Sequence, residues 1–279
     1  MSRMAWTLAE RRGSRIAEQL GSPSLPINPR MIADKKQIAV AAKPLTGCSG
    51  CLMRRGDSFG ILYSSNLPNE GMVNFTIAHE LGHYFLDGHA EALFPDGDGL
   101  HQSSGPFRSS DPREREADHF AVGLLMPETL FVRAIRSAGD GLSAIETLAE
   151  TCGTSLTATA IRFANLADGP VAMVVATEKR IDFCFMSEPL RSLRGLAWPK
   201  KGNTVPGGTV TAKLAAKPDD IENARRLSGG CSFADWIEGA PDCDCTEEVV
   251  GLGRYGQTLT VIWSDDEFED EEETDDEDL

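Results

Sequence analysis

The chain has 279 residues, of which 41% are hydrophobic, so it can bury a substantial core, and its length is typical of about two domains. Its net charge of −16 is concentrated at the C-terminus, where residues 265–279 hold twelve acidic residues and no basic one. The rest of the chain carries −16 + 12 = −4, which argues against nucleic acid as its main partner, and the tail would repel nucleic acid.

The sequence has no feature typical of a membrane or secreted protein. No apolar run reaches transmembrane length, and residues 1–20 carry charges throughout, unlike a signal peptide. The seven cysteines are odd in number and irregularly spaced, unlike a secreted disulfide framework. We therefore expect a soluble, cytoplasmic protein.

The N-terminal part of the chain predicts two helices followed by short strands. Residues 5–20 place apolar side chains among charged ones with helical spacing. Asn28 and Pro29 fit the N-cap and first position of a second, shorter helix. Residues 37–42 and 59–63 are typical of strands, and turns are expected between them.

Cys48 and Cys51 form a C-x-x-C pair in this loop-rich stretch. Such a pair can be redox-active or half of a zinc site, but a zinc site needs a second pair. The sequence offers only Cys243 and Cys245, which are distant and wrongly spaced. We therefore interpret both pairs as ordinary loop cysteines.

Residues 75–89, FTIAHELGHYFLDGH, contain the H-E-x-x-H pattern of zinc-dependent hydrolases, from His79 to His83. On a helix, residues four apart lie on one face about 5–6 Å apart at Cβ, so both imidazoles can bind one cation. Glu80 can lie beside that metal without binding it and take a proton from a metal-bound water. The pattern alone also fits a buried helix with two hydrogen-bonded histidines.

The motif helix is expected to end at Gly88, because glycine readily adopts the left-handed conformation that ends helices. Residues 90–110 are rich in Gly, Ser and Pro and predict a long loop, which could act as a lid or binding loop. A second strong helix then begins after Asp111 and continues to Leu125 with one apolar stripe. Another helix is expected to follow, through Ser137.

A catalytic zinc takes three protein ligands and one open position, and the sequence offers competing residues for the third place. His89 has the spacing of the H-E-x-x-H-x-x-G-x-x-H zincins, but Leu86 stands where that pattern needs glycine. We favour Glu114 on the downstream helix, because Asp118 one turn later can hydrogen-bond a zinc-bound imidazole. Glu114 could instead complete a capping box at the helix start, and Glu116 is the fallback ligand.

The C-terminal half contains two segments that differ in their predicted secondary structure. Residues 143–166 predict two short helices broken at Gly153, with the spacing of a helix-turn-helix. Residues 171–176 and 180–186 then predict a pair of strands, and residues 258–263 predict a closing strand. We therefore expect a separate, smaller α+β domain after the helical part.

Two segments together resemble the ImmA/IrrE family of metallopeptidases: FTIAHELGHYFLDGH at 75–89 and EREADHFAVGLLMP at 114–127. LPINPRMIADKKQIAV at 25–40 adds weaker support, and the resemblance covers roughly residues 15–130. Known substrates of that family are transcriptional repressors. Its radiation-response branch carries a helix-turn-helix and a GAF-like sensor domain after the protease, an order similar to residues 128–264.

The resemblance implies a specific metal site and reaction. It implies that His79, His83 and Glu114 bind one zinc ion per chain, that Glu80 is the catalytic base, and that Asp118 supports the ligands from behind. The expected function is a site-specific regulatory endopeptidase that cleaves a repressor-type transcription factor and so derepresses stress-response or mobile-element genes.

The resemblance also completes the expected organisation. The fold class is α+β: a mainly helical, zincin-like protease domain with a small sheet at 1–130, a helix-turn-helix-like segment at 131–168, and a smaller, possibly GAF-like domain at 169–264. A disordered acidic tail is expected at 265–279.

Peptide hydrolysis normally needs a further donor that stabilises the oxyanion. The sequence does not choose among four candidates: Tyr84, His89, His101 and His119.

A rival interpretation is a DNA-binding transcriptional regulator that uses the helix-turn-helix and keeps a sensory or vestigial metal site. The second helix of that segment has only Arg162 as a basic residue, whereas phosphate contacts need several Lys or Arg. A third interpretation is that the acidic tail mimics DNA and engages a repressor, although such runs are usually solvated tails.

Overall fold

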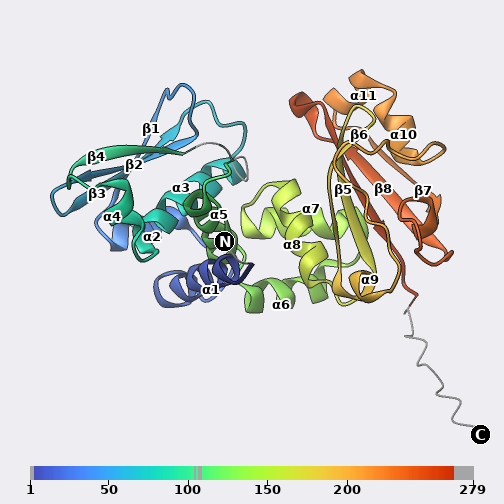
Figure 1. Cartoon of the computed structure of the whole chain (residues 1–279), viewed down its shortest axis with the longest axis horizontal. Helices are drawn as coiled ribbons and strands as arrows, with labels where there is room; N and C mark the ends of the chain where they lie inside the picture. Colours follow the sequence, from blue (N-terminus) through green and yellow to red (C-terminus); the bar gives the residue numbers. More distant parts are fainter. Residues whose placement is uncertain (1–2, 104, 106–108, 267–279) are drawn as a thin grey trace, which may run out of the picture. The chain divides into compact units, whose positions relative to one another are not determined.

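The computed structural model describes residues 3–103, 105 and 109–266. The protein is α+β, with a mainly helical part that contains a small sheet and a C-terminal part built on a second sheet (Figure 1). This confirms the predicted fold class.

The described chain divides into two compact units. The first comprises the residues up to Ala138 together with Glu146–Thr159, and the second comprises Gly139–Ile145 together with the described residues from Ala160 onwards. The domain boundaries at 130 and 168 stay predictions, as does the GAF-like character of the C-terminal domain. The predicted disordered tail lies, except for Asp265 and Asp266, outside the described residues.

Six helices belong to the first unit: α1 (Arg3–Leu20), α2 (Pro29–Lys35), α3 (Glu70–Phe85), α4 (His89–Leu93), α5 (Pro112–Leu125) and α6 (Glu128–Ala138). The axes of α1 and α5 come close because glycines face each other between them. A Cβ on Gly13 would clash with the backbone of Phe120 and Leu124, and a Cβ on Gly123 would clash with the backbone of Glu10. This close packing fixes α5, which carries Glu114.

The sheet of the first unit has the strand order β1-β3-β2-β4, with bounds β1 (Ala39–Lys43), β2 (Gly50–Arg55), β3 (Ser58–Ser64) and β4 (Gly99–Ser103). The β1–β3 pair is parallel and the others are antiparallel. Strand β4 corrects the prediction of a structureless loop at 90–110, because its hydrogen bonds to β2 outweigh its glycine- and serine-rich composition. The pairing fixes His101 opposite Leu52.

The motif helix α3 begins after Asn69, whose side chain accepts a hydrogen bond from Met72 N. It ends at Phe85, because Leu86 is extended, and not at Gly88 as predicted. Gly88 has a φ of 80°, but it begins the next helix, α4. The chain therefore turns back at once and returns His89 towards α3.

Two helices match the predicted helix-turn-helix segment: α7 (Gly141–Cys152) and α8 (Leu156–Leu166). The break falls at Gly153, which has a φ of 62°. Arg162, the one basic residue of α8, is 4% exposed. Among the described residues, no helix combines the length and apolar character required to cross a membrane.

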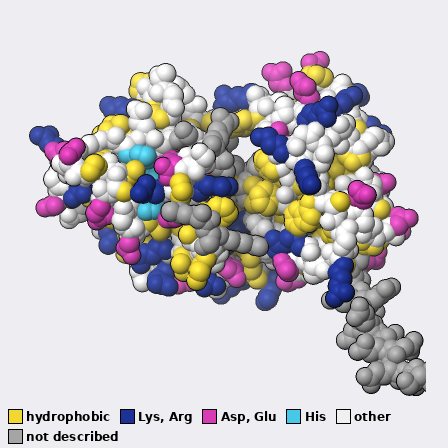
Figure 2. Space-filling model, in the orientation of Figure 1, with side chains coloured by type: hydrophobic (Ala, Val, Ile, Leu, Met, Phe, Trp, Pro, Cys, Tyr) yellow, Lys and Arg dark blue, Asp and Glu magenta, His cyan; other side chains and the backbone are white. Residues whose placement is uncertain are grey.

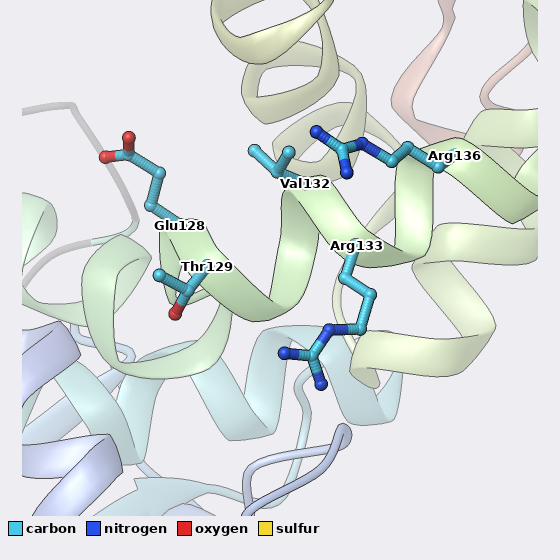
Figure 3. A pocket seen from close by; sticks show the side chains of 5 residues that line it. All are labelled: Glu128, Thr129, Val132, Arg133 and Arg136. Atoms are coloured by element: carbon cyan, nitrogen blue, oxygen red, sulfur yellow. The ribbon is translucent and has the colours of Figure 1, made fainter.

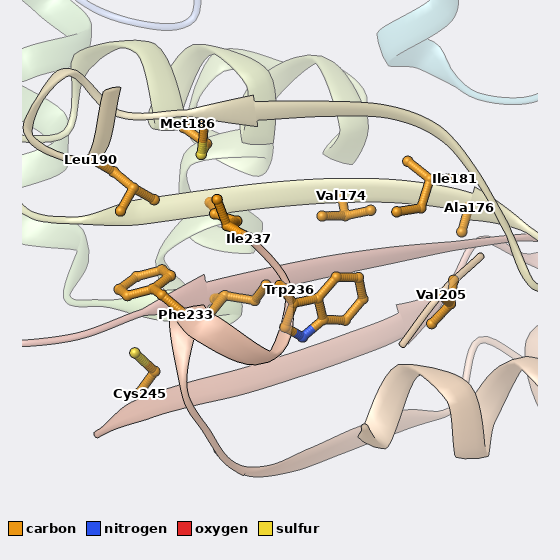
Figure 4. Packing of buried hydrophobic residues seen from close by; sticks show 12 residues of the cluster. Val174, Ala176, Ile181, Met186, Leu190, Val205, Phe233, Trp236, Ile237 and Cys245 are labelled. Carbon is orange, nitrogen blue, oxygen red and sulfur yellow. The ribbon is translucent and has the colours of Figure 1, made fainter. Parts of the chain in front are cut away.

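The second unit is built on an antiparallel sheet with the order β6-β5-β9-β8-β7. Its strands are β5 (Val171–Thr177), β6 (Arg180–Met186), β7 (Arg226–Cys231), β8 (Cys245–Gly251) and β9 (Gln257–Trp263), and its short helices are α9 (Glu188–Ser192), α10 (Val210–Ala215) and α11 (Pro218–Glu222). On one face, Val174 and Ile181 pack with Phe233, Trp236 and Ile237 in a buried cluster (Figure 4).

Candidate metal centre

Helices α3 and α5 bring three metal-binding side chains together. The Nε2 atoms of His79 and His83 lie 3.1 Å apart. Glu114 Oε2 is 3.5 Å from His79 Nε2, and Glu114 Oε1 is 3.1 Å from His83 Nε2. Within the described ranges, this is the one group of His, Cys, Asp or Glu residues whose ligand atoms all lie within 4.8 Å of one another.

The separations of these atoms suit a small tetrahedral cation. Metal–ligand bonds of 2.0–2.1 Å in tetrahedral geometry place neighbouring ligand atoms about 3.3 Å apart. The three observed separations of 3.1 to 3.5 Å surround that value. Two imidazoles and one carboxylate are a ligand set that zinc uses in catalytic sites.

The outer ring nitrogens of both histidines have protein partners. His79 Nδ1 is 2.9 Å from Asp118 Oδ1, and His83 Nδ1 is 3.1 Å from His89 Nδ1. His89 Nε2 in turn lies 3.1 Å from Glu116 Oε2. An ionised carboxylate only accepts hydrogen bonds. We therefore infer that His79 Nδ1 donates to Asp118, that His83 Nδ1 donates to His89 Nδ1, and that His89 Nε2 donates to Glu116.

This pattern of donors leaves lone pairs facing one another at the centre. When both imidazoles are neutral and protonated at Nδ1, as metal ligation requires, each presents a bare Nε2 to the other and to the Glu114 carboxylate. All three side chains are buried, so water does not screen them well. A cation between them removes the repulsion, and the residues therefore fit a bound metal.

The pKa shifts agree with a site that attracts positive charge. Burial lowers the pKa of His79, but hydrogen bonds with Asp118 and Glu114 outweigh burial and raise it to about 10. Burial lowers the pKa of His83 to about 3. Burial raises the pKa of Glu114, but hydrogen bonds from His101 and the two motif histidines outweigh it and hold that pKa well below its usual range. A metal would therefore displace a proton from His79.

Glu80 lies next to this centre and is fully buried. Burial raises the pKa of its carboxyl to about 7. Neither carboxylate oxygen has a hydrogen-bond partner of normal geometry among the described residues. Both oxygens are therefore buried polar atoms without such a partner, which is unusual for a carboxylate and is consistent with a chemical role.

The structure separates the four candidates for the oxyanion donor. His101 on β4 lies at the centre, with Nε2 2.8 Å from Glu114 Oε1 and its ring against that of His83. Its side chain is 21% exposed, so it borders the open side of the site. Histidine atoms reach the surface on this part of the first unit (Figure 2).

The other three candidates point elsewhere. Tyr84 packs edge-on against Phe59, and His119 stacks on Trp6. His89 lies behind His83, on the side of Nδ1.

The competing third-ligand candidates also lie apart from the ligand atoms. Glu116 contacts His89, and neither contributes to the three-residue group. Glu114 could instead have completed a capping box at the start of α5. In the structure Glu114 contacts the histidines, and the Asp111 side chain accepts a hydrogen bond from Arg113 N. Sequence reasoning missed the chain from His83 through His89 to Glu116, whose one sequence signal is the Gly88 turn directly after the motif helix.

An open groove of about 380 Å³ lies along α6 in the first unit and shares no residue with the metal centre. It is lined by Glu128, Thr129, Val132, Arg133 and Arg136 (Figure 3).

Comparison with known proteins gives a family match for the helical part of the chain. Residues 33–164 match the family model of the IrrE N-terminal-like domain, peptidase family M78, which supports assignment of this part of the chain to the ImmA/IrrE family. A solved Mycobacterium tuberculosis transcriptional regulator has a similar fold, with a TM-score of 0.52 and 16% identity over 94% of this chain and 77% of that one. No curated protein matches the sequence. The family match suggests a metallopeptidase, and the solved structure shows a similar fold.

Proposed function

We propose that this protein is a zinc-dependent endopeptidase. The observation that carries this proposal is the buried group of His79, His83 and Glu114, with the Glu80 carboxylate beside it. The M78 family match supports the same conclusion.

The side chains around the centre have distinct roles in the proposed reaction. Zinc held by His79, His83 and Glu114 would supply a Lewis acid that polarises the peptide carbonyl and makes the attacking water more acidic. Glu80 takes the proton from the attacking water and passes it to the leaving amine. When Glu114 binds the metal, His101 gives up its contact with Glu114 and donates instead to the oxygen on which negative charge develops. Asp118 and His89 hold the ligand rings in place.

The proposed substrate is a repressor-type transcription factor, cut at a specific site so that stress-response or mobile-element genes are expressed. The family resemblance supports this choice, as does the likeness to a chain named a transcriptional regulator. Direct DNA binding through α8 has less support, because Arg162 is buried.

Metal analysis of the purified chain tests the ligand assignment. We expect one zinc per chain, and loss of that zinc in Glu114→Ala. Glu91→Ala is the matched control, since Glu91 is exposed on α4. Wild-type zinc content in Glu114→Ala would show that another residue is the third ligand.

A further inference from the structure

Cys48 and Cys51 lie together beside the metal centre. Their Sγ atoms are 3.7 Å apart. Cys51 is on β2 and 1% exposed, whereas Cys48 precedes the strand and is half-buried. The interpretation of the cysteine pairs as loop cysteines is therefore wrong for Cys51, which pairs with Leu62 in the sheet, and for Cys245, which begins β8 and pairs with Cys231.

The backbone between the two cysteines packs directly on the proposed catalytic base. A Cβ on Gly50 would lie 2.6 Å from Glu80 Oε1 and 2.5 Å from Thr76 Cγ2, so the strand touches α3 without spare room. Ser49 N donates a hydrogen bond to Ser103 O at the end of β4, the strand that carries His101. A movement of residues 48–51 would therefore affect both Glu80 on α3 and the end of β4, the strand that carries His101.

We propose that Cys48 and Cys51 form a reversible disulfide and that this disulfide slows reaction at the metal centre. The second of these two statements rests on the proposed peptidase function. Two thiols separated by two residues, one accessible and one buried, are the arrangement that thiol–disulfide exchange requires.

The oxidant is a low-molecular-weight disulfide such as glutathione disulfide. The deprotonated Cys48 Sγ attacks one sulfur of the oxidant, forming a mixed disulfide and releasing one thiol. Cys51 Sγ then attacks Cys48 Sγ, forming the Cys48–Cys51 bond and releasing the second thiol. The two protein thiols are oxidised, the oxidant is reduced to two thiols, and these carry away both protons.

Exposure sets the order of the two attacks. Cys48 is accessible, whereas burial and the neighbouring Cys48 raise the pKa of Cys51 to about 12. Cys51 therefore reacts only once Cys48 carries the mixed disulfide at close range.

Closing the bond draws the two ends of the segment together, because the sulfur atoms have to approach from 3.7 Å to about 2.05 Å. Gly50 packs against Glu80 without room for even a Cβ, so a shift of the backbone towards α3 would displace the carboxylate. Displacement of a catalytic group by about 1 Å costs on the order of 10²-fold in rate.

The chain offers a matched control pair. Cys243 and Cys245 have Sγ atoms 3.5 Å apart in the second unit, but only one residue separates them. Cys243→Ser/Cys245→Ser removes this pair and leaves residues 48–51 intact.

The first test maps disulfides by mass spectrometry in the full chain after incubation with glutathione disulfide. We expect a Cys48–Cys51 bond that dithiothreitol reverses, that is absent in Cys48→Ser, and that persists in Cys243→Ser/Cys245→Ser. Failure to form this bond, or a glutathione adduct that persists on Cys48, would overturn the inference. This test does not depend on peptidase activity.

The second test compares cleavage rates of oxidised and reduced protein. We expect oxidation to slow cleavage by on the order of ten- to a hundredfold, with zinc content unchanged, and Cys48→Ser to be insensitive to the oxidant. Equal rates in a chain with the mapped disulfide would refute the regulatory half alone. Absence of cleavage in the reduced protein would instead count against the peptidase function.

Discussion

In the proposed metal centre, each motif histidine has one ring nitrogen facing the proposed metal position and the other facing a protein partner. Asp118 accepts from His79, and His89 with Glu116 continues the line from His83. These partners fix the tautomer and the orientation of each ring before a metal arrives, which lowers the ordering cost of binding.

Removing the carboxylate behind His79 weakens metal binding. Asp118→Asn replaces an acceptor oxygen by an amide that can also donate, so the preferred tautomer loses its support. We expect zinc affinity to fall by roughly 10- to 100-fold in competition titrations with a chelator. Asp87→Asn, at an exposed position just after α3, is the control. Unchanged affinity in Asp118→Asn would show that the hydrogen bond does not tune the ligand.

Removing the donor on β4 slows chemistry and leaves metal binding intact. We expect His101→Ala to lower kcat by about 10²- to 10³-fold with wild-type zinc content, because an oxyanion donor acts mainly in the transition state. His101→Gln should recover part of the loss, since its amide can still donate. His119→Ala, away from the centre, should keep normal kcat. Equal losses in His101→Gln and His101→Ala would point to a packing role instead.

At the scale of elements, the parts that the sequence predicts well are those with strong local signals. The start of α5 follows from the Asp111 cap, and its Glu114 and Asp118 lie one turn apart as predicted. Strand β4 could not be predicted in this way, because a five-residue Gly/Ser-rich segment becomes a strand only through its pairing with β2. His101 was therefore one candidate among four, and the packing of Gly50 against Glu80 was missed because β2 also takes its place through pairing with β3 and β4.

The close approach of α1 and α5 gives a stability prediction. In Gly123→Ala, the added Cβ meets the Glu10 backbone, so α1 must move away from the helix that carries Glu114. We expect a loss of about 1–3 kcal/mol in the free energy of unfolding, measured by denaturant titration. Gly169→Ala, where no atom lies within 4 Å of the added Cβ, is the control. No loss in Gly123→Ala would mean that the helices can separate freely.

At the scale of the whole molecule, the metal centre lies entirely in the first unit, between α3, α5 and the edge of its sheet. The second unit has its own sheet and core. A role for this unit does not follow from the sequence, because a packed β-sheet core has no motif comparable to H-E-x-x-H.

The most direct test is Glu80→Gln in a cleavage assay with a repressor-type transcription factor, the proposed substrate class. Glutamine preserves the size of the buried side chain but cannot take a proton. We expect zinc content and thermal stability to match wild type, and cleavage to fall by at least about 10²-fold. Cleavage by Glu80→Gln at the wild-type rate would contradict the assignment of this centre as a peptidase active site.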